Sequence, residues 1–393
     1  MSSRRSFLIN AGTLALTQLL SGCDNHSTAL RVLLLQGSIP PQLLKTFRQK
    51  FSEEQSFSFK PTAQLKDIWK QLQSWQEKNQ APQGLKSWLN KLPLVKDDSH
   101  KMSDLATLGD AWLGKAIQDQ LIQPLNLTEI ANWQRLGSRW QALVKRDKAG
   151  NLDLQGQVWG APYRWGTTLI AYHSDKFETL GWTPTNWGDL WREELRHRIA
   201  VVDQPREIIG LTLKKLGYSY NSPNLSQIPN LSSQLQALNQ QIKYYSSQYY
   251  LQPLIIGDVW LSVGWSSDIL PLMAKNRKIK AIVPQSGTSL WTDIWVQPRA
   301  QKNNVNLSTL TKQWINFCWQ ESSVNQISLL TDGVSPMIYT SPTISTKIQT
   351  NPLLFVDKHI MNNCDFIEPL SEQSKREYKK FWKAMREHKK GKE

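Results

Sequence analysis

Hydrophobic positions along the first part of the chain follow two alternating patterns. Residues 30–35 (LRVLLL) form the continuous apolar run that is typical of a buried strand. Apolar side chains then recur at helical spacing from Leu43 to Phe51, and again from Leu65 to Trp75. Strands that alternate with helices in this way build a parallel sheet covered by helices. The pattern therefore predicts the α/β fold class.

The same alternation continues to the end of the chain, where turn residues separate the apolar segments. We expect strands at 104–108, 166–172, 199–203, 259–265, 280–284 and 290–297, and helices at 111–120, 205–216, 232–246, 268–275, 310–319 and from 371 onward. A chain of 393 residues with this many elements exceeds one ordinary core. Two lobes are therefore expected.

The net charge is large, but much of it lies at the two ends of the chain. The sequence holds 47 Lys and Arg against 32 Asp and Glu, a balance of +15. Residues 1–22 contribute +2 and residues 375–393 contribute +6, which leaves about +7 on the body. The last helix has Tyr378 and Met385 on one face, so we expect that face to dock on a lobe while the lysines face solvent. We expect no nucleic-acid partner.

The first residues resemble a bacterial export signal. Arg4 and Arg5 precede an apolar run of roughly 14 residues, which spans only about 20 Å and cannot cross a hydrocarbon core of about 30 Å. We interpret residues 1–22 as a twin-arginine signal peptide that ends in a lipobox, with Cys23 as the lipid attachment site. Asp24 favours retention on the inner membrane. A plain secretory signal before an incidental cysteine is the alternative.

Signatures of catalysis and of metal binding are absent from the sequence. It contains no P-loop, no G-x-G-x-x-G, no G-x-S-x-G and no H-E-x-x-H, and its six histidines never occur at metal-ligand spacing. We expect no enzyme activity, no cofactor and no metal, although a nucleophile and a histidine could still meet in space. Cys318 and Cys364 are expected to be buried free thiols rather than a disulfide.

Three stretches carry a resemblance to a known family. They are 160–168 (GAPYRWGTT), 203–218 (DQPREIIGLTLKKLGY), and 257–266 (GDVWLSVGWS) with its continuation at 287–293 (GTSLWTD). Together they resemble the spermidine/putrescine-binding proteins of ABC transporters, within the bacterial solute-binding protein family 1. The resemblance runs with gaps from about residue 30 to 385.

The resemblance implies a two-lobed periplasmic-binding-protein fold, type II-like, with the ligand cleft between the lobes. Lobe 1 would comprise 23–165 and 292–338, and lobe 2 would comprise 166–291 and 339–393. The implied function is capture of a polyamine or a related small amine and its delivery to a membrane permease. The protein would be a monomer in the periplasm, attached by its N-terminal lipid to the inner membrane.

The resemblance also indicates where the ligand would bind. In the matching W-x-D motif an indole packs on the methylene chain of the amine and a carboxylate takes an ammonium group. Trp165 is added because it adjoins a flexible glycine near the expected hinge, and Asp203 because ligands bind at the carboxyl ends of strands in open α/β sheets. The expected substrate-binding residues are Trp165, Asp203, Glu207, Trp265, Trp291 and Asp293.

The chemistry of these residues suits an amine, but each also has a structural alternative. A polyamine needs aromatic faces for cation–π contacts and carboxylates for its ammonium groups. Trp291 and Asp293 lie two apart on an expected strand, so they share one face. The tryptophans could instead belong to the core. Glu207, Asp110 and Asp268 each stand near the start of a helix, where a carboxylate can serve as a cap.

The sequence departs from the family pattern at several acids. Gln204 stands where the first acid of a D-x-x-E pair is expected, and residues 35–38 replace an expected W-T-E group. At least two carboxylates offered to amines are therefore missing. This leaves open a lipoprotein that kept the fold as an interaction or assembly factor, or a carrier of another solute. Tyrosine pairs at 244–250 resemble those of ferric-ion binding proteins, but without the accompanying acids.

Overall fold

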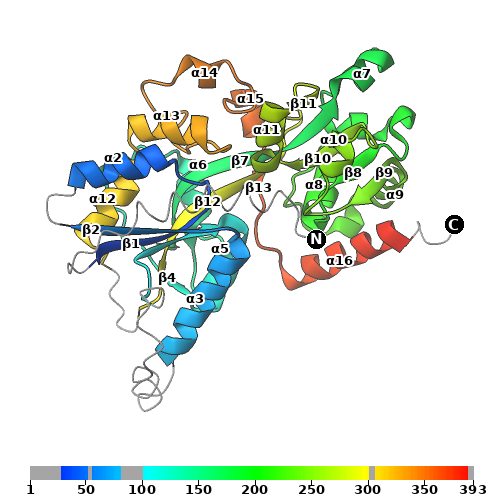
Figure 1. Cartoon of the computed structure of the whole chain (residues 1–393). Coiled ribbons are helices and arrows are strands. Elements are labelled where there is room, and N and C mark those ends of the chain that lie inside the picture. The colour runs from blue at the N-terminus through cyan, green and yellow to red at the C-terminus, as the bar shows by residue number, and fades with distance from the viewer. Residues whose placement is uncertain (1–27, 52–54, 81–100, 301–305, 388–393) are drawn as a thin grey trace, which may run out of the picture.

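The computed structural model describes residues 28–51, 55–80, 101–300 and 306–387. The expected signal peptide at 1–22 and the expected lipid site Cys23 lie outside these residues. Within the described ranges, no helix combines the length and apolar character needed to cross a membrane. The described chain forms two α/β bodies joined by long central strands (Figure 1).

The first body is built on a parallel sheet, as the apolar runs predicted. Strand β1 pairs in parallel with β2 on one side and with β3 on the other. The expected strands and helices of this region are confirmed, except that β2 was not anticipated, because only Phe57 and Phe59 mark its buried side. The elements are β1 (Thr28–Leu35), α2 (Pro41–Phe51), β2 (Ser56–Thr62), α3 (Leu65–Gln80), β3 (Leu105–Gly109) and α5 (Asp110–Gln118).

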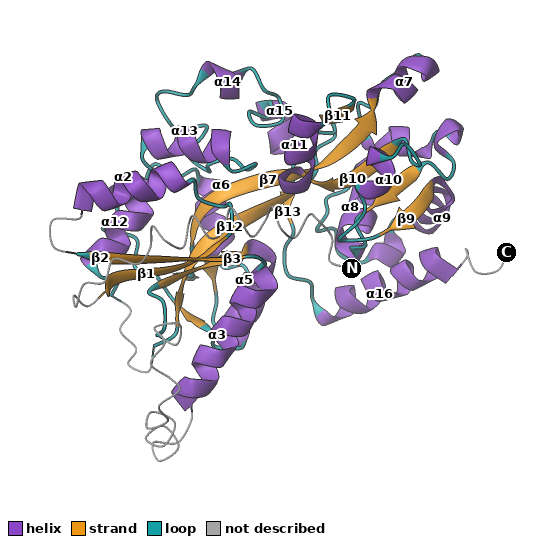
Figure 2. Ribbon diagram, in the orientation of Figure 1, coloured by secondary structure: helices purple, strands orange, loops and turns teal. Residues whose placement is uncertain are grey.

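Two long antiparallel strands, β7 (Ala161–His173) and β12 (Ser289–Pro298), run through the middle of the molecule (Figure 2). The strand order is β2-β1-β3-β12-β7-β10-β8-β9, so both long strands belong to one continuous sheet. A short third strand, β13 (Asp365–Phe366), pairs in parallel with β12. These three segments carry the chain between the two bodies. The lobe boundaries given above remain a prediction.

The second body has its own strands and covering helices. The helix expected at 232–246 ends at Gln241, because the segment Ile242–Tyr245 is β-branched and aromatic and continues as a strand parallel to β8. The elements are β8 (Ile199–Val201), α8 (Pro205–Lys215), α9 (Leu231–Gln241), β9 (Ile242–Tyr245), β10 (Leu261–Trp265), α11 (Ser266–Lys275), β11 (Ile279–Ile282) and α16 (Glu372–Glu387).

The remaining elements are short or lie at the periphery of the two bodies. They are β4 (Ile122–Gln123), η2 (Ala131–Trp133), α6 (Ser138–Val144), β5 (Lys145–Arg146), β6 (Gln157–Val158), α7 (Ser174–Leu180), η3 (Trp187–Trp191), η4 (Glu193–Leu195), η5 (Leu225–Gln227), α10 (Gln252–Ile255), α12 (Thr309–Cys318), α13 (Glu321–Leu330), α14 (Thr346–Gln349) and α15 (Lys358–Asn362). Helix α13 was not anticipated from the sequence.

Each body encloses a hydrophobic core. The first core includes Trp75, from the helical stripe expected at 65–75, and Trp314, from the helix expected at 310–319. The second core receives Tyr378 and Met385 from α16, so the last helix docks as its apolar stripe predicted. Cys318 and Cys364 are both buried free thiols, as expected.

Candidate ligand-binding site

One face of the β7–β12 ribbon carries three rows, each formed by one residue of β7 and the residue opposite it on β12. In the antiparallel register Arg164 lies opposite Asp293 and Gly166 lies opposite Trp291. Residues two apart on a strand share a face, so Thr168 and Ser289 form the next row, and their hydroxyl oxygens are 2.9 Å apart. We number the rows from Thr168–Ser289 (first) through Gly166–Trp291 (middle) to Arg164–Asp293 (third). With Glu207 and Trp265 beside them, these rows are called the binding stripe.

Glu207 closes the first row from the first turn of α8. Its Oε2 accepts hydrogen bonds from the hydroxyls of Ser289 (2.7 Å) and Thr168 (3.1 Å), and its Oε1 accepts one from the Trp265 indole nitrogen (3.2 Å). The side chain is 4% exposed, and this burial raises the pKa of the Glu207 carboxyl above its usual value.

The helix-capping interpretation of Glu207 is wrong. Helix α8 has no side-chain hydrogen bond at its N-cap, Gln204, and both carboxylate oxygens of Glu207 bond to side chains from three strands, β7, β10 and β12. The structure thus brings together Glu207 and Trp265, two of the expected substrate-binding residues.

Trp291 lies over Gly166 in the middle row. A Cβ atom at Gly166 would come within 2.3 Å of both the Trp291 ring and the Ser266 hydroxyl, so only glycine allows the indole to pack directly on the neighbouring strand. The side chains of Trp265 and Trp291 are both half-buried. Each indole therefore keeps some surface exposed beside the strands.

The third row is a buried ion pair. The Nε and Nη2 atoms of Arg164 lie 2.8 Å and 2.6 Å from Oδ2 of Asp293, which is 3% exposed. Burial raises the pKa of the Asp293 carboxyl, and the Arg164 guanidinium opposes that rise. Asp293 is thus neutralised by a cation of its own chain.

Two further acids near the stripe make contacts other than caps. Asp110, the first residue of α5, accepts a hydrogen bond from the Thr292 backbone N–H (3.0 Å), and burial raises its pKa to about 7. Asp268 in α11 accepts a hydrogen bond from the Tyr250 hydroxyl (2.8 Å). The sequence favoured helix capping for both acids, but these hydrogen bonds join them to other segments of the chain.

With this geometry in hand, comparison with known proteins decides the family. The family model described as bacterial extracellular solute-binding protein matches residues 101–364, about two thirds of the chain. The chain is a bacterial extracellular solute-binding protein.

Curated relatives of this solute-binding protein bear out the resemblance seen in its motifs. It is 23% identical over 356 residues to the spermidine/putrescine-binding periplasmic protein of Escherichia coli, with 91% of each chain covered. It is 25% identical over 254 residues to the putrescine/cadaverine-binding protein of Pseudomonas aeruginosa, covering 61% of this chain and 71% of the relative.

A solved structure confirms the expected fold of the solute-binding protein. PotD, the substrate-binding protein of a spermidine/putrescine ABC transporter from Streptococcus pneumoniae, matches with a TM-score of 0.74 at 20% identity. The match covers 92% of this chain and 99% of that one. The two-lobed periplasmic-binding-protein fold is thereby established.

Two of the six expected ligand residues of the solute-binding protein lie apart from the stripe. Trp165 is 1% exposed, packs against Trp140 and donates its indole N–H to the Ser335 carbonyl (3.2 Å). Asp203 is exposed and accepts a hydrogen bond from Arg386 of α16 (2.8 Å). A ligand-binding role for either residue remains a prediction.

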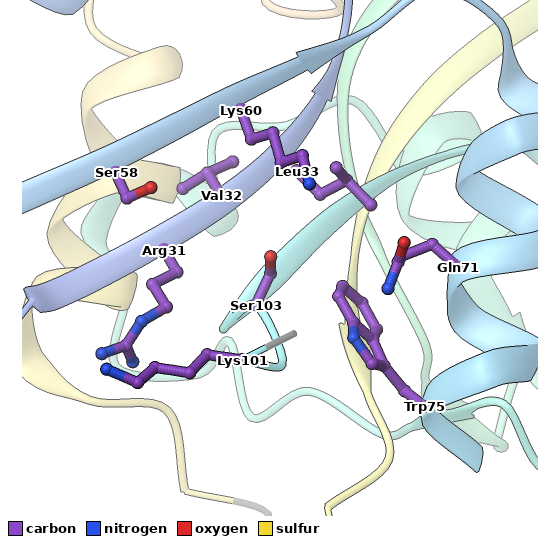
Figure 3. Close-up of a pocket in the computed structure, with 9 residues that line it drawn as sticks. All are labelled: Arg31, Val32, Leu33, Ser58, Lys60, Gln71, Trp75, Lys101 and Ser103. Atoms are coloured by element: carbon purple, nitrogen blue, oxygen red, sulfur yellow. The ribbon is translucent and has the colours of Figure 1, made fainter. Parts of the chain in front are cut away.

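A separate hollow in the first body has the wrong charge for an amine. It lies between β1, β2 and α3, and its polar lining includes Arg31, Lys60 and Lys101 but no carboxylate (Figure 3). Among the described residues, no group of three or more His, Cys, Asp or Glu is placed to hold a metal ion. The binding stripe is therefore a stronger candidate for an organic cation than this hollow.

Sequence reasoning missed Arg164. Its signal was present, because a single charged residue stands inside the strand APYRWGTTLIAYH, whose other positions are apolar, hydroxyl-bearing or glycine until the final histidine. Its importance depends on the register that pairs it with Asp293, and that register cannot be read from either strand alone.

Proposed function

We propose that this solute-binding protein captures a small organic amine, a polyamine such as putrescine or spermidine or a related amine, for an ABC importer. Its relatives in Escherichia coli and Pseudomonas aeruginosa are named for binding spermidine, putrescine or cadaverine. The ligand would lie along the binding stripe and pass from there to a membrane permease. We propose no catalytic role.

The observation that carries this proposal is the environment of Glu207. Three neutral donors surround its carboxylate, and a half-buried indole adjoins it. Among the residues that the structure describes, no Lys, Arg or His forms a salt bridge with Glu207. The charge of Arg206, the preceding residue of α8, offsets only part of the effect of burial on Glu207, whose pKa stays raised. A buried carboxylate without a salt bridge is costly, and an ammonium group seated against Trp265 would relieve that cost.

The cellular placement belongs to the same proposal. Its relatives are named periplasmic proteins. We propose that residues 1–22 direct twin-arginine export, that Cys23 carries the lipid anchor on the inner membrane, and that the protein works there as a monomer. A Cys23→Ser variant tests the anchor, because it should lose its association with the membrane.

A second candidate function is favoured by one specific contact. Arg164 already neutralises Asp293, so one carboxylate of the stripe is not available to a ligand. A protein that kept the fold but serves as an interaction or assembly factor would show such a closed site. This candidate predicts no response to any small solute.

Thermal unfolding with a ligand panel tests the proposal. Putrescine, cadaverine and spermidine should raise the Tm of the mature protein, because a ligand at 100 times its Kd adds about 2.7 kcal/mol of stability. Glu207→Gln should lower amine affinity at least tenfold while Thr168, Ser289 and Trp265 keep a partner. A response to sugars or anions but to no amine would contradict the proposal.

Glu377→Gln provides the matched control. The Glu377 carboxylate also accepts hydrogen bonds from a hydroxyl and a backbone N–H, those of Ser226 and Leu225, and it lies between α16 and η5. The same chemical change at this position should leave amine affinity as in the wild type. Equal losses in both variants would point to a general effect on folding instead of a binding role for Glu207.

A further inference from the structure

The most informative feature of the stripe is what already fills its third row. Three nitrogens of the Arg164 guanidinium have partners: Nε and Nη2 face Asp293, and Nη1 donates to the Thr331 carbonyl (2.7 Å). The same guanidinium carbon lies 5.3 Å from the centre of the Trp291 ring. Arg164 thus contacts a carboxylate and an aromatic face at once.

A carboxylate beside an aromatic face is a receptor for an organic cation. The carboxylate supplies a charge-assisted hydrogen bond, and the ring supplies cation–π attraction. Asp293 and Trp291 form such a receptor on β12, and the guanidinium of Arg164 occupies it. The receptor is therefore filled from within the chain.

The surroundings hold Arg164 in this position. A Cβ atom at Gly333 would come within 2.7 Å of Cγ of Arg164, so the loop after α13 packs directly on the arginine stem. Trp165, the next residue along β7, exchanges backbone hydrogen bonds with Val334 of the same loop (2.8 and 2.7 Å). Both the stem and the head of Arg164 are thus fixed by neighbours.

The first row offers a contrast. Glu207 has an indole beside it, as Asp293 has, but its hydrogen bonds come from two hydroxyls and an indole N–H, all neutral donors. Glu207 bonds to Ser289, which lies on the same side of the ribbon as Asp293. Ser289 and Asp293 are four residues apart on β12, a separation of about 13 Å at 3.3 Å per residue. The stripe therefore has one acid in an ion pair, Asp293, and one acid without a salt bridge, Glu207.

We propose that Arg164 determines ligand specificity by acting as a permanent occupant of the Trp291–Asp293 subsite. The inference rests on the proposed amine-binding function and names the ligand class within it. The protein binds one ammonium group, at Glu207 and Trp265, and gains nothing from a second. An amine with a single cationic end is therefore sufficient, because Asp293 is not available to the second ammonium group of a longer diamine.

Pairs of amines of equal length test this in the wild-type protein. Butylamine is compared with putrescine, and octylamine with diaminooctane, because the longer pair can span the two rows. The expected result is that each diamine binds within about threefold of its monoamine. A diamine advantage of tenfold or more would overturn the inference while leaving the amine-binding function intact. Failure of every amine to bind would overturn the proposed function itself.

Arg164→Met provides the decisive variant. It vacates the subsite and leaves Asp293 without a cation, so the eight-carbon diamine should gain at least tenfold over octylamine. Arg164→Met with Asp293→Asn removes both charges and should show no such gain. An unchanged ratio in the single variant would overturn the inference. Loss of binding for carboxylate-bearing amines in that variant would also do so, because Arg164 would then contact ligand.

Instability of the single variant does not prevent the test. Arg164→Lys keeps a cation in the subsite and should retain the wild-type ratio between diamine and monoamine. If Arg164→Met unfolds alone but regains a cooperative transition with diaminooctane and not with octylamine, the inference is supported. Equal rescue by both amines would contradict it.

Discussion

At the scale of single residues, burial governs the acids of this protein. Glu207, Asp293 and Asp110 are all nearly inaccessible, and burial raises the pKa of each. They differ in what opposes that effect: neutral donors at Glu207, a guanidinium at Asp293 and a backbone N–H at Asp110. The partner of each carboxylate decides whether it remains available to a ligand.

Asp110 should make stability depend on pH. Its pKa is 3.8 when unfolded and about 7 when folded, so between these values the native state holds a proton that the unfolded state has released. The free energy of unfolding should therefore fall as pH rises from about 4 to about 7, by at most about 1.4 kcal/mol per pH unit from this group. Urea unfolding at several pH values measures this slope.

Asp110→Asn should flatten that slope, since the amide oxygen can still accept from the Thr292 N–H but no longer titrates. Asp119→Asn is the control: Asp119 follows the other end of α5 and forms a surface ion pair with Lys115. Loss of this exposed ion pair should leave the slope of stability against pH unchanged. An Asp110→Asn profile as steep as the wild type would assign the pH dependence to other acids.

At the scale of elements, the close approach of β7 and β12 depends on one glycine. Gly166→Ala would place a methyl group 2.3 Å from the Trp291 ring, so the indole or the strand must move. We expect a loss of about 1–3 kcal/mol in the free energy of unfolding, with weaker amine binding. Chemical denaturation and amine titration of the variant measure the two effects.

Gly188→Ala is the matched control for this substitution. Gly188 lies in η3, and nothing would lie within 4 Å of its added Cβ. Its stability should stay within about 0.5 kcal/mol of the wild type. A Gly166→Ala protein that is equally unaffected would show that Trp291 can shift without cost, and the indole would then be no fixed part of the stripe.

The helices and strands also show how much of the fold the sequence alone predicts. Continuous apolar runs and helical stripes located β1, α2, α3 and α16, because each buries one face in a core. The sequence prediction included the strand β9 in the helix before it. The chain passes from helix to strand near Lys243 without a glycine, proline or other turn residue that would mark the boundary. Local pattern identifies an element better than its end.

The candidate site was predictable only in part, for a related reason. Glu207 and Trp265 were each expected in the pocket from the family resemblance, but the choice between cap and pocket for Glu207 needed three strands brought together in space. The ion pair between Asp293 and Arg164 could be predicted only from the register of β7 against β12. Both facts are long-range, and spacing along one segment does not contain them.

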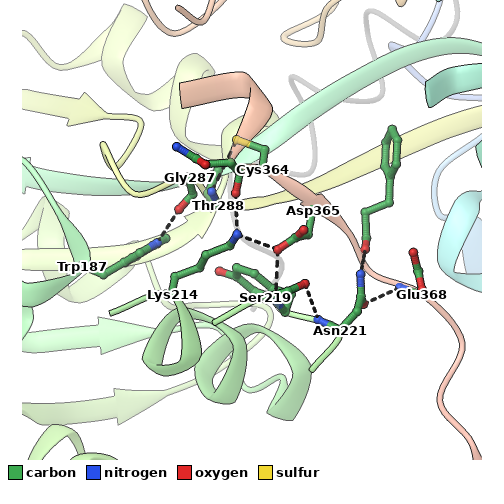
Figure 4. A network of polar contacts seen from close by, with 12 residues as sticks. Trp187, Lys214, Ser219, Asn221, Gly287, Thr288, Cys364, Asp365 and Glu368 are labelled. Carbon is green, nitrogen blue, oxygen red and sulfur yellow. Dashed lines mark hydrogen bonds and ion pairs between the residues drawn. The ribbon is translucent and has the colours of Figure 1, made fainter. Parts of the chain in front are cut away.

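At the scale of the whole molecule, the third crossing segment ties the two bodies together. Asp365 forms an ion pair with Lys214 of α8 (2.7 Å), and the amide of Asn221 donates to the Phe366 carbonyl (2.8 Å) while its carbonyl accepts from the Glu368 N–H (3.0 Å). Figure 4 shows these bonds along the strand β13. The first body also holds the segment, because Arg139 of α6 donates to the Met361 and Cys364 carbonyls (2.8 Å each).

Asn221→Ala should therefore loosen the crossing segment. It removes the acceptor of the Glu368 N–H and the donor to Phe366, so hydrogen exchange at Glu368 should accelerate. The free energy of unfolding should fall by about 1–3 kcal/mol, because partly buried polar groups lose partners. Exchange measured by mass spectrometry on peptides covering 363–370 detects the change.

Asn325→Ala separates this local tie from a general loss of hydrogen bonds. Asn325 in α13 makes an equivalent pair of bonds, donating to the Thr343 carbonyl and accepting from the Ser345 N–H, but these partners flank Ile344, which packs on the first core, and they lie outside 363–370. It should cost similar stability and accelerate exchange near 345, while peptides at 363–370 keep wild-type protection. If Asn221→Ala leaves those peptides protected, the remaining bonds from α8 hold the segment without it: the Lys214–Asp365 ion pair and the hydrogen bond from Arg206 to the Glu368 carbonyl (3.0 Å).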